Sequence, residues 1–526
     1  MQPKVVVAEK IADSGIETLQ ASCRVEMAVG VERTELLSRM GDAEGLVVRS
    51  ATQVDAELIA AAPRLRVIGR AGIGVDNIDV GAATEAGIVV VNAPQANIIS
   101  AAEHALALML AQARNVPRAD ATLRSGVWDR SRFEGVELHG KTLGVIGLGR
   151  IGTLVAQRAL AFGMRLTAYD PYVSEERGRR LGVEMVDLDS LLAESDFITI
   201  HLPMTSDTEG LIGKEALSKV KPGVRIVNAA RGGILDEDAL AEAIREGRVA
   251  GAALDVYSAE PLTESPLFHE DRVVVTPHLG ASTAEAQDKA GTDVAEAVAA
   301  ALRGELVLSA VNVDMGSSVP DEVAAYLPVA EQLGRVFTAL AGGLPERLTV
   351  RVAGRVGSGE VRPLTLAVMK GALSSVSSRA VTYVNVPSLA DQHGISVDQE
   401  TSAEAQHYQS VVSVRGSVGG REASVSATRT RKGPTLVEIL GHDVELPVSS
   451  RMLIVRNADV PGVIGRLGSF LGDQGVNIAN MVVGRAPGTG DAAMMGLNLD
   501  DSLTDDQLAQ LRRLQGIEEA RYVSLG

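Results

Sequence analysis

Three ionisable residues in the middle of the chain, Arg231, Glu260 and His278, follow short runs of Val, Ile, Leu and Ala, Glu260 after a brief turn. Such runs are typical of buried parallel strands, whose carboxyl ends meet at one edge of a sheet. We therefore expect the three side chains to converge. An arginine can clamp a carboxylate, a histidine can exchange a proton near neutral pH, and a glutamate can orient that histidine. The set predicts hydride transfer at the α-carbon of a small hydroxy acid.

A glycine-rich turn precedes these residues. Gly147, Gly149 and Gly152 follow an apolar run and open the helical run 151–160. Glycines at this spacing allow a tight turn, close approach of a pyrophosphate and tight helix-to-strand packing. Asp170 ends the next apolar run, 18 residues after Gly152. An acid there accepts hydrogen bonds from the adenosine ribose and repels a 2′-phosphate, which favours NAD over NADP. The predicted cofactor residues in this turn are Gly147, Gly149, Arg150, Ile151, Gly152 and Asp170.

Parallel sheets are needed to position these residues. The short apolar runs alternate with longer amphipathic segments, which indicates two series of alternating strands and helices. The sequence predicts an α/β fold with two Rossmann-like lobes, the first binding substrate and the second binding NAD. The predicted strands of the first lobe are 5–8, 45–49, 66–69 and 87–91, and those of the second are 142–146, 165–169, 197–200, 225–229, 251–256 and 272–276.

Two long helices are predicted to connect the lobes. The first spans 98–115, with Ser100 as its N-cap and Glu103 completing a capping box. The second is the Ala-rich segment 283–302, which returns the chain to the first lobe. The Gly, Ser and Pro residues of 314–320 indicate a linker.

Composition narrows the function classes. A formal net charge of -17 argues against nucleic acid or an anionic membrane as partner, because either needs a basic surface. Cys23 is the only cysteine, so one chain can form neither a disulfide framework nor a cysteine metal cluster, and we predict no metal. No apolar stretch reaches the length of a membrane span. We expect a soluble, cytoplasmic protein.

Together these motifs resemble the D-2-hydroxyacid dehydrogenases. The resemblance rests on the segments 147–152 with Asp170, 228–233, 253–261 and 276–280, and it covers most of residues 1–312. It implies that Arg231, Glu260 and His278 have the catalytic roles argued above, and that Asp255 holds the nicotinamide amide. The further cofactor-lining residues that it implies are Ala229, Ala230, Arg231, Asp255, His278, Leu279, Gly280 and Ala281.

The first lobe supplies candidate anion ligands at its strand ends. Arg49 and Arg70 each end an apolar run, and the segment 70–74 adds glycine amides. Guanidinium groups and exposed amides suit a phosphate and a carboxylate. Asn97 begins the interlobe helix and is expected to cap it, although contact with the substrate carboxylate stays open. The predicted substrate residues in segments that match substrate-contacting segments of the family are Arg49, Ser50, Arg70, Ile73 and Gly74. Asn97 is added as a candidate.

Residues 321–450 are predicted to form a mixed α+β domain whose chemistry the sequence does not reveal. Residues 451–526 have the βαββαβ order of a ferredoxin-like unit and resemble the ACT domain, which binds amino acids at paired interfaces. The resemblance implies L-serine as effector and a homo-oligomer, either a dimer or a homotetramer. A Pro-Gly helix start without a ligand remains an alternative. The implied effector residues are Asn457, Asp459, Pro461, Gly462, Asn477 and Ile478.

The overall length resembles that of long family members that oxidise 3-phosphoglycerate with NAD at the start of serine biosynthesis. Two alternatives remain open: a glyoxylate or hydroxypyruvate reductase with a regulatory tail, and an NAD-sensing corepressor without catalytic activity. The predicted domains are a substrate lobe of 1–97 and 283–313, an NAD lobe of 98–282, the mixed domain 321–450 and the ACT domain 451–526.

Two further histidines and one tryptophan have less specific surroundings. His104 lies in the middle of the interlobe helix, so we expect a packed or exposed helical residue rather than a catalyst. His201 ends a strand and either lines the adenine side or has a structural role. Trp128 is the only tryptophan. We favour docking against a neighbouring subunit for Trp128, because tryptophan is enriched at interfaces.

Overall fold

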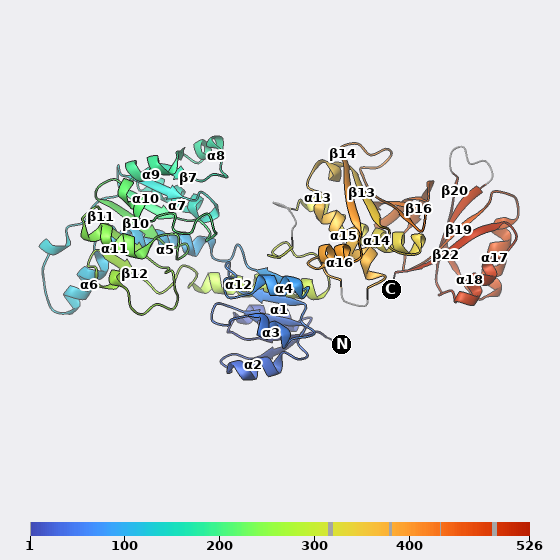
Figure 1. Ribbon diagram of the computed structural model, residues 1–526, viewed down its shortest axis with the longest axis horizontal. Coiled ribbons are helices and arrows are strands. Elements are labelled where there is room, and N and C mark those ends of the chain that lie inside the picture. Colours follow the sequence, from blue (N-terminus) through green and yellow to red (C-terminus); the bar gives the residue numbers. More distant parts are fainter. Residues whose placement is uncertain (1, 314–318, 378–380, 432, 486–491, 526) are drawn as a thin grey trace.

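The computed structural model describes residues 2–313, 319–377, 381–431, 433–485 and 492–525 (Figure 1). Four separate sheets succeed one another along the described chain. Most of the predicted linker, 314–318, lies outside the described residues. Among the residues that are described, no helix is both long and apolar enough to cross a membrane.

The first lobe contains a five-stranded parallel sheet in the order β2-β1-β3-β4-β5. The four predicted strands are present, and the edge strand β2 is an addition. The strands are β1 (Lys4–Val7), β2 (Arg24–Met27), β3 (Gly45–Val48), β4 (Val67–Arg70) and β5 (Val89–Asn92). The helices between them are α1 (Asp13–Gln20), α2 (Arg33–Arg39), α3 (Ala56–Ala60) and α4 (Val80–Glu85).

The second lobe has a seven-stranded parallel sheet in the order β12-β11-β10-β9-β6-β7-β8. The order reverses between β6 and β9, which is where open α/β sheets bind ligands. Its strands are β6 (Thr142–Ile146), β7 (Arg165–Tyr169), β8 (Glu184–Met185), β9 (Phe197–Ile200), β10 (Val224–Asn228), β11 (Val249–Leu254) and β12 (Val273–Val275). Its helices are α6 (Val116–Arg124), η1 (Ser131–Phe133), α7 (Arg150–Ala161), α8 (Glu175–Arg180), α9 (Leu188–Glu194), α10 (Lys214–Lys219), α11 (Glu237–Arg245) and η2 (Pro266–His269). The predicted doubly wound α/β fold is confirmed.

Two helices join the lobes, α5 (Ile98–Ala113) and α12 (Ala284–Leu302). The prediction of Ser100 as N-cap is wrong, because the helix begins after Asn97. The Ser100 hydroxyl donates to the Asn97 carbonyl oxygen, a bond that a serine makes inside the first turn. Thr283 caps α12 by accepting the amide of Ala286. The buried face of α12 packs on the first-lobe strands.

The mixed-sheet domain, residues 319–447, follows with a six-stranded sheet in the order β14-β13-β15-β16-β17-β18. β13 and β14 are parallel and the other pairs are antiparallel. Its strands are β13 (Arg347–Gly354), β14 (Ser396–Ser402), β15 (Ser410–Val418), β16 (Arg421–Thr430), β17 (Gly433–Ile439) and β18 (His442–Pro447). Its helices are α13 (Asp321–Ala324), α14 (Leu327–Ala341), η3 (Arg355–Ser358), α15 (Arg362–Ser374) and α16 (Val386–Gln392).

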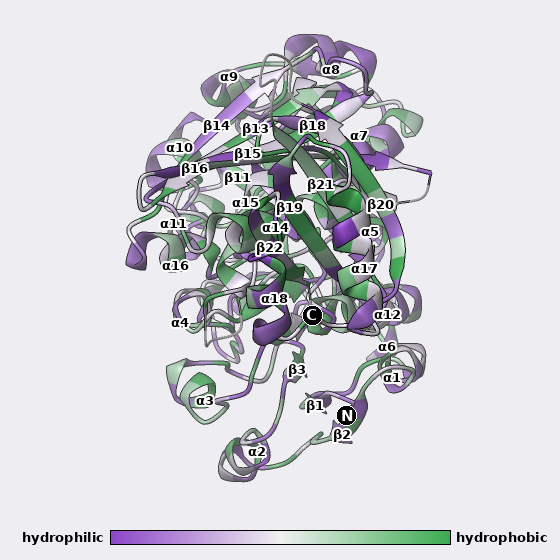
Figure 2. Ribbon diagram, turned by 90° about the vertical axis from the view of Figure 1, so that its right-hand side faces the viewer, coloured by the Kyte–Doolittle hydropathy of each residue, from purple (hydrophilic) through white to green (hydrophobic). Residues whose placement is uncertain are grey.

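The C-terminal domain, residues 451–525, has the predicted βαββαβ order and an antiparallel sheet in the order β20-β21-β19-β22. Its elements are β19 (Arg451–Ala458), α17 (Val463–Asp473), β20 (Ile478–Arg485), β21 (Ala492–Leu499), α18 (Asp505–Leu511) and β22 (Ile517–Ser524). One set of apolar side chains from this sheet packs beneath α17 and α18. The central strands β19 and β21 are largely coloured as hydrophobic in Figure 2, consistent with their burial on both faces.

The other face of that sheet belongs to the core of the mixed-sheet domain. Met452, Ile454, Met494 and Val523 are buried together with side chains from α14, α15 and the six-stranded sheet. The Asn498 side-chain amide adds a hydrogen bond to the Pro447 carbonyl oxygen. The two domains therefore share one hydrophobic core.

A chain of polar contacts runs from the first lobe to the end of the chain. Lys370 on α15 donates to the carbonyl oxygen of Gly304, just after α12, at 2.8 Å and to Glu331 on α14 at 2.7 Å. Arg335 donates to the same Glu331 carboxylate and to the carbonyl oxygen of Leu525. The Lys370 side chain is only 8% exposed. Lys370, Glu331 and Arg335 therefore connect the first lobe, the mixed-sheet domain and the end of the chain through buried or half-buried side chains.

Candidate active site

The turn between β6 and α7 has the shape of a phosphate cradle. Gly147 has a φ of 94°, and a Cβ atom on Gly152 would lie 2.0 Å from the Gly147 carbonyl oxygen. Both positions therefore require glycine. Around Gly149, in contrast, no described atom lies within 4 Å of an added Cβ atom. The open space at Gly149, beside the N-terminus of α7, fits the close approach of a dinucleotide pyrophosphate.

Asp170, at the end of β7, holds this turn. One carboxylate oxygen accepts the Leu148 amide at 2.8 Å and the other accepts the Tyr172 amide at 3.0 Å. Each oxygen keeps a second lone pair, so both can also accept a ribose hydroxyl. The predicted cofactor residues of the turn and Asp170 are thus neighbours, as the sequence motif requires.

His278 and Glu260 form a hydrogen-bonded pair, with Nδ1 of the imidazole 2.6 Å from Oε2. The other Glu260 oxygen accepts the backbone amide of Tyr257 at 3.0 Å. Burial alone would raise the pKa of Glu260, but the hydrogen bonds from His278 and Tyr257 outweigh it and the pKa is lowered. Glu260 is therefore ionised near neutral pH. Because Nδ1 faces the carboxylate, Nε2 is the nitrogen that can exchange a proton with a substrate.

His278 occupies the left-handed region of the backbone, with a φ of 55°. A residue with a side chain adopts this conformation at a cost of about 1–3 kcal/mol, and such strain clusters at functional sites. The Asp255 carbonyl oxygen accepts the His278 amide at 2.9 Å. The Asp255 side chain accepts the amides of Leu279 and Gly280 at 2.7 and 2.9 Å. One residue at the end of β11 thus fixes the loop that carries the imidazole.

Arg231 lies between the lobes. Its guanidinium donates to the Ala230 carbonyl oxygen and lies 3.9 Å from the exposed carboxylate of Asp76. A Cβ atom on Gly74 of the first lobe would be 2.7 Å from Arg231 Nη2. Gly74 therefore makes room for the arginine of the second lobe.

A cavity of about 190 Å³ collects most of the predicted residues of the reaction centre. The predicted catalytic residues Arg231 and His278 are on its wall, and Glu260 contacts the imidazole. His201 also faces it, where burial lowers the pKa of the imidazole to about 4, so this histidine is neutral and bonds to Thr199. The other predicted residues on the wall are Ile73, Asn97, Ile151, Ala229, Ala230, Asp255, Gly280 and Ala281.

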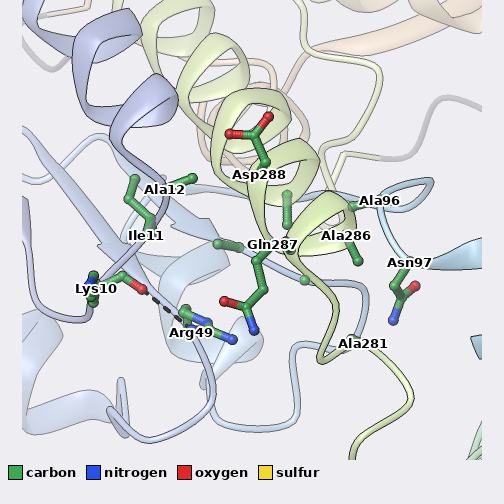
Figure 3. Close-up of a pocket in the computed structure, with 14 residues that line it drawn as sticks. Lys10, Ile11, Ala12, Arg49, Ala96, Asn97, Ala281, Ala286, Gln287 and Asp288 are labelled. Carbon is green, nitrogen blue, oxygen red and sulfur yellow. Dashed lines mark hydrogen bonds between the residues drawn. The ribbon is translucent and has the colours of Figure 1, made fainter. Parts of the chain in front are cut away.

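A second cavity, of about 430 Å³, adjoins the first and shares Asn97 and Ala281 with it. Arg49 lines it, and in Figure 3 the side chains of Arg49 and Gln287 point toward one another. Lys10, at the end of β1, also lines this cavity. The sequence analysis missed Lys10 and Gln287, although the strand-end rule that found Arg49 also applies to Lys10.

Two polar atoms beside these cavities have no partner among the described residues, Arg70 Nε and Asn97 Oδ1. Burial lowers the pKa of Arg70, and the nearby charge of Arg231 lowers it further. The expected N-cap bond of Asn97 is not formed, because its side chain makes no bond to the helix amides. Ser50 lines neither cavity. An anionic ligand can accept from Arg70 Nε, whereas Asn97 Oδ1 is an acceptor and requires a donor such as a ligand hydroxyl group.

Of the predicted effector residues, Asn457, Asp459, Pro461 and Gly462 lie near the start of α17, whereas Asn477 and Ile478 lie at the opposite end of the sheet, where Ile478 pairs with Leu499. Gly462 precedes this helix with a φ of 90°. Asp459 pairs with Arg485 at 2.7 Å, and Asn477 donates to Asp500 at 2.6 Å. Asn457 is buried and donates to the Ala458 carbonyl oxygen. Pro461 and Ile478 lie at the ends of the same two loops. Asp459, expected to meet an ammonium group, already meets a guanidinium.

Three family models match the chain in sequence order. The D-isomer specific 2-hydroxyacid dehydrogenase NAD binding domain matches residues 106–280, the D-3-phosphoglycerate dehydrogenase intervening domain matches 322–440, and the ACT domain matches 451–516. A solved Thermus thermophilus protein is 35% identical, covers 59% of this chain and 99% of its own, and has a TM-score of 0.55. D-lactate dehydrogenase from Aquifex aeolicus, solved with NAD and lactic acid, is 29% identical with a TM-score of 0.52, covering 57% of this chain and 96% of its own. Fold and site together define an NAD-dependent D-2-hydroxyacid dehydrogenase.

Curated relatives extend the similarity to the whole chain. D-3-phosphoglycerate dehydrogenase of Mycobacterium tuberculosis is 51% identical over 96% of each chain. The enzyme of the same name from Archaeoglobus fulgidus is 43% identical over 99% of this chain and 100% of its own. The chain belongs to the D-3-phosphoglycerate dehydrogenase family.

Proposed function

We propose that the chain oxidises 3-phosphoglycerate to 3-phosphohydroxypyruvate, with NAD as hydride acceptor, as the first step of serine biosynthesis. The observation that carries the proposal is that the His278–Glu260 pair and Arg231 adjoin a second cavity lined by Arg49 and Lys10. One cavity supplies acid–base chemistry beside the glycine cradle, and the other supplies positive charge for a phosphate. The full-length similarity to D-3-phosphoglycerate dehydrogenases supports the same substrate.

In this reaction the C2–H bond and the O–H bond of the substrate both break. His278 Nε2 takes the hydroxyl proton, while ionised Glu260 stabilises the resulting imidazolium and keeps the ring oriented. Arg231 binds the carboxylate and polarises the developing carbonyl. The turn 147–152 and Asp170 would hold NAD, which would supply the hydride acceptor. In the reverse direction His278 returns the proton.

The arginines of the first lobe select an anion against the net charge of the protein. We propose that Arg49 binds the phosphate, that Arg70 strengthens the local positive charge, and that Asn97 helps to orient the substrate. Arg70 is half-buried and its Nε atom has no partner among the described residues, so this N–H group can donate to a ligand. Guanidinium groups form strong charge-assisted bonds with phosphate oxygens. A substrate without the phosphate would leave this cavity unused.

The experiment that tests the proposal measures NADH formation by the full chain with 3-phosphoglycerate, D-glycerate and D-lactate. We expect kcat/KM for 3-phosphoglycerate to exceed that for D-glycerate at least 100-fold, and Arg49→Gln to reduce this preference. Exposed Arg165→Gln serves as the matched control. Equal turnover of the two substrates would overturn the proposal. Faster reduction of glyoxylate or hydroxypyruvate than of 3-phosphohydroxypyruvate would favour the reductase alternative.

We further propose that L-serine binds at the start of α17 and inhibits the enzyme, in a cytoplasmic homo-oligomer whose C-terminal domains pair. The support is the ACT match together with the polar side chains of Asp459, near the start of α17, and of Asn477, at the opposite end of the sheet, which pairing of two domains would bring together. Titration of the wild type with L-serine, using D-serine and glycine as controls, tests this. Inhibition by L-serine that Asn477→Ala weakens is expected. Insensitivity of the wild type would rule out this regulation.

A further inference from the structure

The carboxylate of Asp255 is fully buried and is surrounded by donors from two different elements. Three of them belong to the segment that ends in the catalytic loop: the Thr276 hydroxyl at 2.5 Å and the amides of Leu279 and Gly280. The fourth is His104 on the interlobe helix α5, whose Nε2 atom lies 3.1 Å from Oδ1. Nε2 is also 3.3 Å from the Thr276 hydroxyl. The sequence analysis expected no such role for a mid-helix histidine.

We infer that His104 is a positioning residue of the dehydrogenase: its Nε2–H, donated to Asp255, fixes the carboxylate that shapes the catalytic loop and faces the cofactor cavity. The inference rests on the proposed function, because it assigns His104 a part in holding NAD for hydride transfer. His104 itself touches neither of the two cavities, so it acts through Asp255.

The division of donors between the two carboxylate oxygens supports this role. Oδ1 receives Thr276, Leu279 and His104, whereas within the described chain Oδ2 receives only Gly280. Three donors saturate Oδ1. Oδ2 therefore keeps acceptor capacity, and an N–H group such as that of the nicotinamide carboxamide is the kind of donor that it can accept. Asp255 forms part of the wall of the cavity that also contains His278.

The charge of this buried carboxylate depends on the same donors. Burial by itself raises the pKa of Asp255, but the hydrogen bonds from His104, Thr276 and Leu279 outweigh burial and lower it. A buried carboxylate that loses a donor pays a desolvation penalty, which is larger for charged groups than for neutral ones. Without His104, the carboxylate would be freer to rotate away from the amides of Leu279 and Gly280.

The location of His104 connects the two cavities. α5 begins after Asn97, which lines both cavities, and His104 lies about two turns further along the same helix. α5 therefore places a substrate-side residue and the support of a cofactor-side carboxylate on one rigid element. A purely structural explanation, in which the imidazole only fills space beneath β12, makes no use of its N–H group, and the two explanations differ in their consequences.

The test compares His104→Phe, which keeps a planar ring without a donor, with His104→Asn, which keeps a donor. Glu103→Gln is the control, because Glu103 is the adjacent residue of α5 and its side chain is 62% exposed. NADH binding to the full chain is measured by fluorescence titration, and kcat and both KM values are measured with 3-phosphoglycerate. We expect His104→Phe to raise the NADH Kd about tenfold, in line with the loss of one hydrogen bond to a charged group, with KM for 3-phosphoglycerate nearly unchanged. His104→Asn should recover most of the affinity, and Glu103→Gln should match the wild type.

Two results would overturn the inference: a folded His104→Phe variant with wild-type NADH affinity, or equal losses in the Phe and Asn variants. If His104→Phe does not fold, Thr276→Val removes another donor to the same oxygen, and unchanged NADH affinity in that variant would count against the inference. NADH binding requires no turnover. A wild type that binds NADH but does not oxidise 3-phosphoglycerate would therefore contradict the proposed function while the binding comparison still decides the role of His104.

Discussion

Glu260 accepts the Tyr257 amide with one carboxylate oxygen and contacts His278 Nδ1 with the other, at 3.0 and 2.6 Å. The imidazole is thus connected, through a single side chain, to the backbone that follows β11. A rotation of the histidine ring would break a charge-assisted bond, so its second nitrogen keeps a fixed direction toward the cavity.

Glu260→Gln should reduce turnover without preventing folding, because glutamine can keep the bond to the Tyr257 amide but cannot stabilise an imidazolium by charge. We expect kcat to fall roughly 10²-fold, within the usual contribution of acid–base catalysis, with NADH affinity near the wild-type value. Single-turnover measurements of NADH formation test this. Exposed Glu264→Gln is the control and should change nothing. A Glu260→Gln enzyme with full activity would remove the glutamate from the mechanism.

The two glycines Gly149 and Gly152 should respond differently to alanine. At Gly152 the new methyl group would overlap the Gly147 carbonyl oxygen, so we expect Gly152→Ala to destabilise the protein by about 1–3 kcal/mol. At Gly149 the methyl group meets open space. Gly149→Ala should keep the wild-type melting temperature and lose NADH affinity. Thermal unfolding together with NADH titration separates the two effects, and normal NADH binding by Gly149→Ala would argue against a pyrophosphate at this turn.

Lys370→Met should remove the ammonium partner of half-buried Glu331 and leave Arg335 as its remaining cationic partner. Removing one member of a buried ion pair costs about 3–5 kcal/mol, so urea unfolding should show a large loss of stability. The aromatic ring of Tyr383, 4.8 Å from Lys370 Nζ, would also lose a cation contact. The double variant Lys370→Met with Glu331→Leu should recover much of the loss, because the half-buried carboxylate is then removed together with its ammonium partner, and Arg335, which loses the same carboxylate, has a side chain that is 36% exposed. Equal stability of the wild type and Lys370→Met would show that the pair contributes little.

Glu9 should make stability depend on pH on the acid side. Its carboxylate accepts the amides of Arg49, Ala51 and Thr52. Burial raises its pKa, but these bonds outweigh burial and lower the pKa from the ordinary value of 4.5. The stabilisation is therefore complete above about pH 4.5 and is lost as the pH falls through the lower pKa of the folded state. As the pH is lowered below 4.5, the melting temperature should fall less steeply for Glu9→Gln than for the wild type. The exposed control Glu17→Gln should behave as the wild type does. Parallel curves for Glu9→Gln and the wild type would exclude this contribution.

Sequence patterns located the central strands and the edge strands β5 and β12, but missed one edge strand in each lobe. β2 and β8 pair with one neighbour each and contain charged residues such as Arg24, Glu26 and Glu184, so they lack the apolar run that marks a central strand. Ser100 misled the assignment of a helix start because a serine can bond equally well from inside the first turn. The spacing of apolar residues shows which face of a helix is apolar. It does not show which carboxylate of another element, such as Asp255, will contact a residue of that helix.

The candidate site likewise contains residues that the sequence could predict and residues that only the packing of separate elements reveals. Arg231 and His278 were predictable because strand ends of one parallel sheet meet at one edge, and Glu260 because it follows its strand closely. His104 reaches the site only through packing of α5 against β12, and Gln287 only through the position of α12. Such contacts depend on how separate elements dock, which spacing along one chain does not specify.

The mixed-sheet domain and the C-terminal domain share one hydrophobic core. A conformational change at the effector loops must therefore be transmitted through that core. Met452 and Ile454 lie on the strand that leads into those loops and are also interior residues of the neighbouring domain. Within the described chain, there is no flexible linker that could take up a shift of that strand. Such a shift would instead open a gap beside α14. If the C-terminal domain were produced alone, the apolar face of its sheet would be exposed to water. The domain is therefore a poor candidate for study as an isolated fragment.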